Sequence, residues 1–321
     1  MKHIMIKKLL FFFFLAMFTG TVFGCAKKEK ELPKVKVIRR ITSNDNFPSL
    51  NNKKIAIFVG AHSKWDDKLT KSVDEFCEKF NAVVFCDHTS NYRGKFRVLA
   101  SVLASQHNYV SECCKMDVLI DIGNISGAYF KFKATEIWRV NLDGQIRDAS
   151  RKLSYVFDMD EKDFFEKYSK VGNYQKITSS YFNDCLDECE RLRKKISDIP
   201  FSNVWIAQQT ADKLPKNSVL HLGILNTLRS WNYFEVDKSI NVYSNTGGFG
   251  IDGCLSSLIG ASLYNSEKIY FGIIGDLSFF YDMNVVGNRH VGNNVRIMII
   301  NNGRGTEFRN AMHMASRFND D

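Results

Sequence analysis

The segment from Lys268 to Thr306 constrains the fold of this chain more than any other stretch. It begins with an apolar run rich in β-branched residues, Ile269 to Ile274, which breaks at Gly275-Asp276. A segment of helical length follows, and a second apolar run, Val295 to Ile300, ends at Asn301-Asn302. The pattern predicts a β-α-β unit with polar residues at the carboxyl end of each strand, where open α/β sheets bind ligands. An Asp and an Asn at adjacent strand ends can direct oxygen ligands to one hard cation, which would hold a phosphate.

These motifs resemble the fingerprint of thiamin-diphosphate (ThDP)-dependent enzymes, a Gly-Asp-Gly and an Asn-Asn separated by some two dozen residues. Here they are Gly275-Asp276 and Asn301-Asn302. Upstream, Tyr243 to Gly253 (YSNTGGFGIDG) is similar to the Ser-Asn-x-Gly-x-x-Gly-Ile-Asp-Gly segment of the menaquinone-pathway synthase that joins 2-oxoglutarate to isochorismate. That synthase also has Gly-Asp-Leu-Ser, as this chain has at Gly275 to Ser278. The resemblance implies an α/β, ThDP-binding fold of the menaquinone-synthase or acetolactate-synthase type, with two Rossmann-like domains and parallel sheets.

The resemblance implies a magnesium site at the two strand ends. Asp276, the side chain of Asn302 and the backbone carbonyl of Arg304 correspond to the Mg²⁺ ligands of the family. Mg²⁺ prefers octahedral oxygen coordination and commonly takes one or two carboxylates plus phosphate oxygens. The amides of Leu277 and Ser278 open a helix whose positive end favours the diphosphate.

The remaining cofactor and substrate residues follow from the same resemblance. Ile251 corresponds to the apolar residue that lies between the two rings of ThDP, and Gly250 and Gly253 allow close approach of the backbone. Gly275 is a further cofactor-binding residue by resemblance. Arg229 lies where the synthase has a substrate-binding arginine, and an ordinary surface-helix arginine is the alternative. Each motif alone is compatible with an N-cap or an Asx turn, so it is their combination that favours the family.

Residues 53–158 alternate strands with helices, which predicts a middle Rossmann-like domain with a parallel sheet. A capping box, Ser72-x-x-Glu75, is expected to open one helix. The turn Gly60-Ala61-His62-Ser63 lacks the further glycines of a dinucleotide fingerprint, and His62 and His88 are interpreted as solvated loop residues. The expected strands are Ile55–Val59, Ala82–Cys86, Val118–Ile122, Ile137–Val140 and Tyr155–Phe157, with a helix over Val98–Ser105.

Residues 159–200 are charge-rich and are expected to form a helical connection between domains. Residues 201–321 alternate again and are expected to form the ThDP pyrophosphate-binding domain, shortened at its carboxyl end. The expected strands are Val219–Leu222 and Ile240–Tyr243. One expected helix carries an apolar stripe of Val204, Ala207, Ala211 and Leu214. Two further helices are expected over Ile224–Phe234 and Cys254–Tyr264.

The N-terminus does not match the rest of the chain. Residues 1–30 have a basic start, the apolar run Leu9–Gly24 and a charged continuation, which is typical of a secretory signal, and Gly24-Cys25 also fits a bacterial lipoprotein signal. Residues 31–52 are expected to form a linker. We favour a cytoplasmic location because ThDP and 2-oxo acids are cytoplasmic. Membrane anchoring through a lipidated Cys25 is the alternative.

Composition fits a globular protein of two domains. The chain has 321 residues, of which 45% are hydrophobic and 25% are charged. Its net charge of +9 is spread among acidic residues, and no motif indicates a nucleic-acid partner. The eight cysteines show no CxxC pair, which favours a reduced compartment. Cys77, Cys86 and Cys254 are predicted to be core residues, and Cys185 and Cys189 to lie on an exposed helix face; a metal site beside nearby carboxylates is the alternative.

The family's pyrimidine domain, which carries the glutamate that activates ThDP, has no counterpart among these segments. The expectation is therefore the ThDP and Mg²⁺-binding portion of an enzyme that decarboxylates a 2-oxo acid and transfers the acyl group, inactive alone and with no assignable catalytic residue. The family's shared active site implies at least a homodimer. One alternative is a half-enzyme complemented by a separate pyrimidine-domain subunit. Another is a membrane-anchored lipoprotein with a binding function only.

Overall fold

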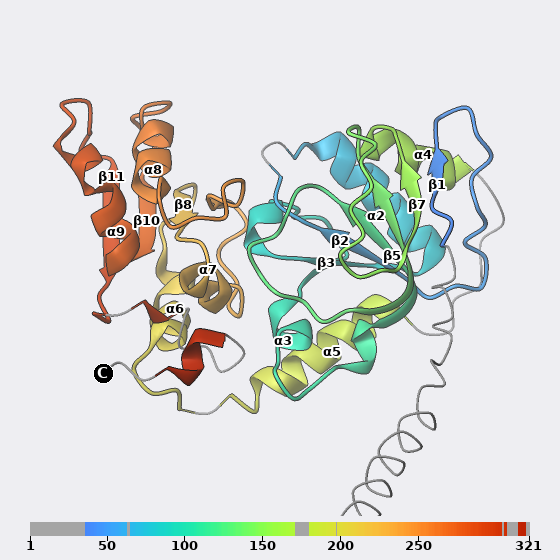
Figure 1. The fold of residues 1–321 in the computed structure, drawn as a ribbon, viewed down its shortest axis with the longest axis horizontal. Helices are drawn as coiled ribbons and strands as arrows, with labels where there is room; N and C mark the ends of the chain where they lie inside the picture. Colours follow the sequence, from blue (N-terminus) through green and yellow to red (C-terminus); the bar gives the residue numbers. More distant parts are fainter. Residues whose placement is uncertain are drawn as a thin grey trace, which may run out of the picture. The chain divides into compact units, whose positions relative to one another are not determined.

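A computed structural model describes residues 36–62, 65–170, 180–196, 198–303, 305–306 and 314–318. By its internal contacts the chain divides into Met1–Val37 and Ile38–Asp321, and the fold reported below is that of the second unit. It contains a seven-stranded sheet and a four-stranded sheet, and every strand pair in both is parallel (Figure 1). The predicted α/β fold with two parallel sheets is confirmed.

The first sheet has the strand order β1-β7-β6-β5-β2-β3-β4. The chain enters its centre at β2, builds outward through β3 and β4 on one side, and then returns through β5, β6 and β7 on the other. The central strands read as continuous apolar runs because both of their faces are covered. The strands are β1 (Arg39–Ile41), β2 (Ile55–Val59), β3 (Val83–Cys86), β4 (Arg97–Leu99), β5 (Lys115–Ile122), β6 (Lys133–Val140) and β7 (Leu153–Phe157).

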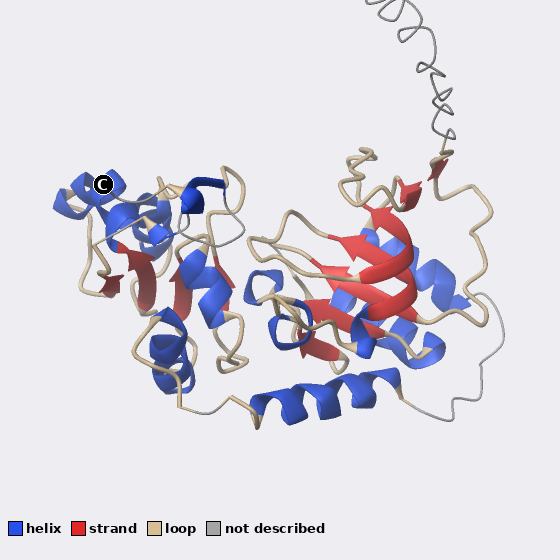
Figure 2. Ribbon diagram, turned by 60° about the horizontal axis from the view of Figure 1, so that its bottom comes forward, coloured by secondary structure: helices blue, strands red, loops and turns tan. Residues whose placement is uncertain are grey.

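Helices cover both faces of this sheet (Figure 2). On one face, α2 (Asp67–Phe80) and α4 (Glu161–Lys170) contribute Phe76, Phe164 and Phe165 to an aromatic core around Trp138. On the other face, α3 (Ser101–Ala104) and α5 (Tyr181–Arg193) pack on a second core that contains Phe85 and Tyr181. The segment predicted as a connection over 159–200 therefore supplies, through α4 and α5, one helix to each face of the first sheet.

Three local predictions for this region are wrong. The helix α2 begins at Asp67, before the predicted capping box, because Asp66 Oδ1 accepts a hydrogen bond from Leu69 N at 2.8 Å and forms the N-cap. The expected helix at 98–105 is divided between β4 and the short α3, since pairing with β3 extends the sheet at this edge. Within the predicted linker, Arg39–Ile41 forms β1 and pairs with β7.

The second sheet has the order β11-β10-β8-β9. Its strands are β8 (Val219–Leu222), β9 (Asn241–Tyr243), β10 (Tyr270–Gly275) and β11 (Val295–Ile300). One face is covered by α6 (Asn203–Thr210) and α7 (Asn226–Trp231), and the other by α8 (Cys254–Ser262) and α9 (Asp276–Asp282). Short 3₁₀ helices are η1 (His88–Ser90), η2 (Glu112–Cys114), η3 (Ala211–Lys213), η4 (Met283–Gly287) and η6 (Met314–Arg317).

The strand β11 is only partly buried, although its sequence is an apolar run that suggests a buried strand. In the described part of the chain it pairs with β10 alone, so it is an edge strand. Met298 and Ile299 on it are 38% and 42% exposed. An edge strand lacks the neighbour that would cover such side chains, which explains the difference.

Hydrogen bonds join the first layered region, which is the first sheet with its covering helices, to the second layered region, which is the second sheet with its covering helices. Asn232 Oδ1 accepts from the backbone amide of His88 at 3.0 Å, and a ring nitrogen of His88 lies 2.8 Å from the carbonyl oxygen of Phe234. Arg97 is paired with Glu235 at 2.6 Å. His88 is fully buried, so its interpretation as a solvated loop residue is wrong. Its burial, the main cause, lowers its pKa to about 4, and the imidazole is neutral in this contact.

Candidate functional site

A cavity of about 390 Å³ lies where β8, β10 and β11 end. Carboxyl ends of parallel strands meet at one edge of a sheet, and this is the edge where open α/β folds bind ligands. Its wall is polar at the ends of β10 and β11 and apolar around Ile224, Phe249 and Ile251. The lining residues are Asn203, Gly223, Ile224, Leu225, Asn226, Thr227, Phe249, Ile251, Gly275, Asp276, Leu277, Ser278, Tyr281, Ile300, Asn302, Gly305 and Thr306.

The carboxylate of Asp276 connects the two strand ends. Asp276 is the first residue of α9, directly after β10. Its Oδ1 accepts from the amide of Leu277 at 2.9 Å, and its Oδ2 accepts from the amide of Gly303 at 2.9 Å. The amide of Gly303 also donates to Asn301 Oδ1 at 3.1 Å. This carboxylate is therefore held in place before any ligand binds, and it faces the Asn301-Asn302 turn as the sequence predicts.

Glycine is required at position 303 for a conformational reason. Gly303 has φ +63°, a left-handed conformation that other residues adopt at a cost. Gly275 differs, because its φ of −73° is ordinary and a Cβ added there would meet no atom within 4 Å. Since Gly275 lines the cavity, its missing side chain leaves space for a ligand.

The glycine-rich turn is attached to α9. Ser278, which is buried, donates from Oγ to the carbonyl oxygen of Ile251 at 2.6 Å. Asn245 Nδ2 donates to the carbonyl oxygen of Asp252 at 2.9 Å and closes the turn. These two bonds hold the turn that brings Ile251 and Phe249 into the wall of the same cavity as Asp276.

Not every predicted site residue lines the cavity. Ile251, Gly275, Asp276, Leu277, Ser278 and Asn302 do. Of the other residues that the structure describes, Gly250, Gly253 and Arg229 do not. The guanidinium of Arg229 lies 4.3 Å from the centre of the Tyr129 ring, which is a cation–π contact with the first layered region. Arg304 lies outside the described residues.

Sequence reasoning missed the contribution of the segment after β8. Leu225 has φ +72° and ψ −119°, a conformation that costs about 1–3 kcal/mol for a residue with a side chain. It delays the start of α7 to Asn226, whose Nδ2 donates to Thr306 Oγ1 at 2.7 Å. The sequence signal for this contribution was Gly223, which directly follows the apolar strand β8 beside β10. Its position marks a third strand end at the same edge of the sheet.

Asn203 contributes an unpaired acceptor near this site. Asn203 lines the cavity, and its side-chain oxygen is buried with no hydrogen-bond partner among the described residues. A buried polar atom without a partner is unfavourable, so a bound group with a hydrogen-bond donor would satisfy it. Within the described ranges no group of three or more His, Cys, Asp or Glu side chains could hold a metal ion. A cation held at Asp276 and Asn302 would therefore need ligands from a bound molecule or water.

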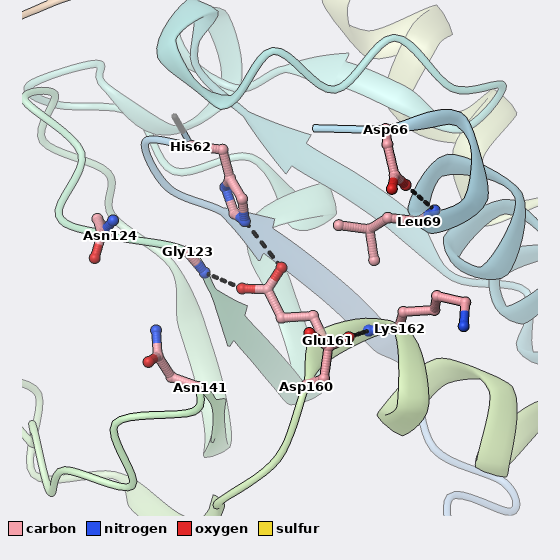
Figure 3. A pocket seen from close by; sticks show the side chains of 9 residues that line it. All are labelled: His62, Asp66, Leu69, Gly123, Asn124, Asn141, Asp160, Glu161 and Lys162. Carbon is pink, nitrogen blue, oxygen red and sulfur yellow. Dashed lines mark hydrogen bonds and ion pairs between the residues drawn. The ribbon is translucent and has the colours of Figure 1, made fainter. Parts of the chain in front are cut away.

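A second cavity of about 380 Å³ lies at the carboxyl edge of the first sheet (Figure 3). Here His62 Nε2 is 2.9 Å from Glu161 Oε2, while Glu161 Oε1 accepts from the amide of Gly123 at 2.9 Å. The His62 side chain is only 10% exposed, so its interpretation as a solvated residue is wrong. Burial alone would lower the pKa of His62, but the hydrogen bond and charge of Glu161 outweigh it and raise the pKa.

Comparison with known proteins identifies the class. The fold, the two strand-end motifs and the curated relatives agree, and the chain belongs to the thiamin-diphosphate-dependent enzyme family. Its relatives carry the name 2-succinyl-5-enolpyruvyl-6-hydroxy-3-cyclohexene-1-carboxylate synthase. No protein-family model matches the chain.

Three of these relatives illustrate the extent of the match. The Flavobacterium johnsoniae synthase is 29% identical over 283 residues, which cover 84% of this chain and 50% of the synthase. The Desulfotalea psychrophila synthase is 36% identical over 252 residues, or 76% of this chain and 45% of the synthase. The Christiangramia forsetii synthase is 46% identical over 114 residues, or 36% of this chain and 20% of the synthase. In the two longer matches the chain spans about half the length of its relative.

No helix in the described part of the chain is both long enough and apolar enough to cross a membrane.

Proposed function

We propose that the cavity at the ends of β8, β10 and β11 binds ThDP together with Mg²⁺. The observation that carries this proposal is the fixed carboxylate of Asp276, which hydrogen-bonds across the two strand ends and faces Asn302 in the same cavity. Asp276 and the side-chain oxygen of Asn302 would coordinate Mg²⁺, with diphosphate oxygens and water as further ligands. The carbonyl oxygen of Arg304 is proposed as a third protein ligand.

The apolar part of the cavity wall suits the rings of ThDP, and the polar part suits its diphosphate. ThDP carries aromatic rings and a diphosphate, and the cavity is apolar around Ile251 and Phe249 but polar around Asp276. The helix α9 has only seven residues, so its dipole adds little, and the cation is the main counter-charge for the diphosphate. Gly275 leaves open space beside that charge.

By its family, the complete enzyme would decarboxylate a 2-oxo acid and transfer the remaining acyl unit to an acceptor. Bound ThDP supplies the carbon nucleophile for that chemistry. The residues described here would hold the diphosphate and orient the cofactor, and Asn203 would accept a hydrogen bond from the bound group. Arg229, which does not line the cavity but lies on α7, whose first residues do, is proposed as a substrate residue by resemblance. The glutamate that activates the aminopyrimidine is proposed to come from a separate pyrimidine-domain subunit. Without such a partner we expect binding and no turnover.

Calorimetric titration of the purified full chain with ThDP, with and without Mg²⁺, tests the proposal. We expect binding that requires Mg²⁺. Loss of a group that only supports a metal ligand lowers affinity roughly 10- to 100-fold. Because Asp276 would be a ligand itself, Asp276→Ala should lower the affinity by more than this. Glu267→Gln removes an exposed carboxylate from the turn before β10 and is the matched control, expected to bind as the wild type does. Equal binding by the wild type and Asp276→Ala would refute the proposed site.

A further inference from the structure

Four cysteines gather on one face of the first sheet. Cys113 and Cys114 belong to η2, and Cys185 and Cys189 lie one turn apart on α5. All four are free thiols within one buried cluster, so the prediction that Cys185 and Cys189 are exposed is wrong. Cys113 is 9% exposed, whereas Cys114 and Cys185 are fully buried and Cys189 is 3% exposed. Cys113 is therefore the cysteine of this cluster that solvent reaches most readily.

The side chain of Cys113 packs against the turn of α5 that carries Cys185. Its Sγ lies 3.6 Å from the carbonyl oxygen of Asp184, the residue before Cys185. Cys185, the next residue on α5, lies with Cys113 in the same buried cluster. The hydroxyl of Tyr181 on the same helix donates to the backbone carbonyl of Cys113. Both the backbone and the side chain of Cys113 are thus held against one turn of α5.

The surroundings make the two thiols unequal. The neighbouring thiol of Cys185 is the main cause that lowers the pKa of Cys113 to about 7. The charge of Lys54 acts in the same direction, and its Nζ lies 4.3 Å from the centre of the Tyr181 ring. The Cys113 thiol in turn raises the pKa of Cys185. Burial raises the pKa values of Cys114 and Cys189 to about 12. Because a thiolate is the reactive form, Cys113 is the nucleophile of the cluster and Cys185 its neighbouring thiol.

We propose that Cys113 and Cys185 are a peroxide-oxidisable pair that forms a disulfide between η2 and α5. In the first step the Cys113 thiolate attacks hydrogen peroxide, takes one oxygen and becomes a sulfenic acid, and the other oxygen leaves as water after taking up protons. In the second step the sulfur of Cys185 displaces the hydroxyl of the sulfenic acid, which leaves as a second water. Two thiols and one peroxide give one disulfide and two waters, and a dithiol reductant reverses the change.

Peptide mass spectrometry of the full chain tests the pair. After brief treatment with equimolar hydrogen peroxide and blocking with iodoacetamide, we expect a cross-linked peptide pair that contains Cys113 and Cys185, 2 Da lighter than the two thiols and absent after dithiothreitol. In untreated protein, alkylation of Cys113 should be half-maximal near pH 7, while Cys77 and Cys86, which are fully buried, remain unlabelled. Absence of the cross-link, together with no labelling of Cys113 below pH 8, would overturn the proposal.

Three variants separate the two roles of Cys185. Cys185→Ser keeps a hydrogen-bond donor, so Cys113 should still be alkylated at pH 7, but its oxidation should stop at the sulfenic acid. Cys185→Ala removes both the donor and the second sulfur, so the alkylation midpoint should move upward by more than one pH unit. Cys189→Ser, one turn along the same helix, is the matched control and should form the cross-link normally. A cross-link lost in Cys189→Ser but retained in Cys185→Ser would assign the second sulfur to Cys189 and contradict the proposal.

Discussion

Replacing Gly275 by alanine should separate the stability of the fold from the binding function of the site. A Cβ at this position meets no atom within 4 Å, and the backbone φ of −73° suits any residue. The substitution removes freedom from the unfolded chain, which stabilises a protein by about 0.4–1 kcal/mol where the native conformation is compatible. For a chain of this size we expect the melting temperature to rise by about 1–3 °C. The measurement is thermal unfolding of the protein without ligand.

The same methyl group should weaken cofactor binding. Gly275 lines the cavity beside Asp276, so the methyl occupies space that the proposed diphosphate and cation need. Overfilling a packed site costs about 1–3 kcal/mol, which corresponds to about a 5- to 150-fold loss of affinity for ThDP and Mg²⁺ by calorimetry.

Gly272, on the same strand, provides the matched control. A Cβ there would lie 2.5 Å from Leu258 Cδ2, so Gly272→Ala should lower the melting temperature while leaving the cavity unchanged. A Gly275→Ala protein that melts below the wild type, or that binds ThDP as tightly, would refute the reasoning.

Two further predictions concern the first layered region. Because Glu161 raises the pKa of His62, the pair stabilises the fold below the unfolded His pKa of about 6.5 and loses this contribution as pH rises through the folded value. The measurement is the melting temperature as a function of pH above about pH 6.5, where Asp121, with its pKa of about 6, is already ionised. In this range Glu161→Gln should remove the decline in melting temperature. A decline unchanged from that of the wild type would contradict its assignment to the His62–Glu161 pair. Glu235→Gln leaves the nearly buried guanidinium of Arg97 without its ion-pair partner and should cost about 1–3 kcal/mol in urea unfolding, whereas an unchanged midpoint would show that the pair contributes nothing.

The periodic elements of the fold could be predicted from sequence. The strand Ile55–Val59 and the strand Val295–Ile300 were predicted at the bounds that the structure shows, because each is a short, mostly apolar run ended by Gly or Asn. The start of α2 was missed because two capping signals compete there, and the sequence alone does not rank Asp66 above Ser72. The strand β4 was missed because its conformation depends on pairing with β3, a tertiary effect that overrides local propensity.

The candidate site was predictable where its residues follow strand ends. Asp276 and Asn302 lie in one cavity because both end a strand of the same parallel sheet, which the alternating pattern already indicated. The strained backbone of Leu225 carries no sequence signal, since leucine is an unusual residue for a positive φ. Likewise, the burial of Cys185 and His88 is set by elements distant in sequence, namely η2 and the segment after α7.

A crystal structure of the full chain with ThDP and Mn²⁺ would test the central claim most directly. Mn²⁺ replaces Mg²⁺ at oxygen ligands and is located by its anomalous scattering. We predict one peak within coordinating distance of side-chain oxygens of Asp276 and Asn302, in contact with the diphosphate. A peak on other residues, or ThDP bound at the cavity beside His62 and Glu161 with no metal at Asp276, would contradict the account.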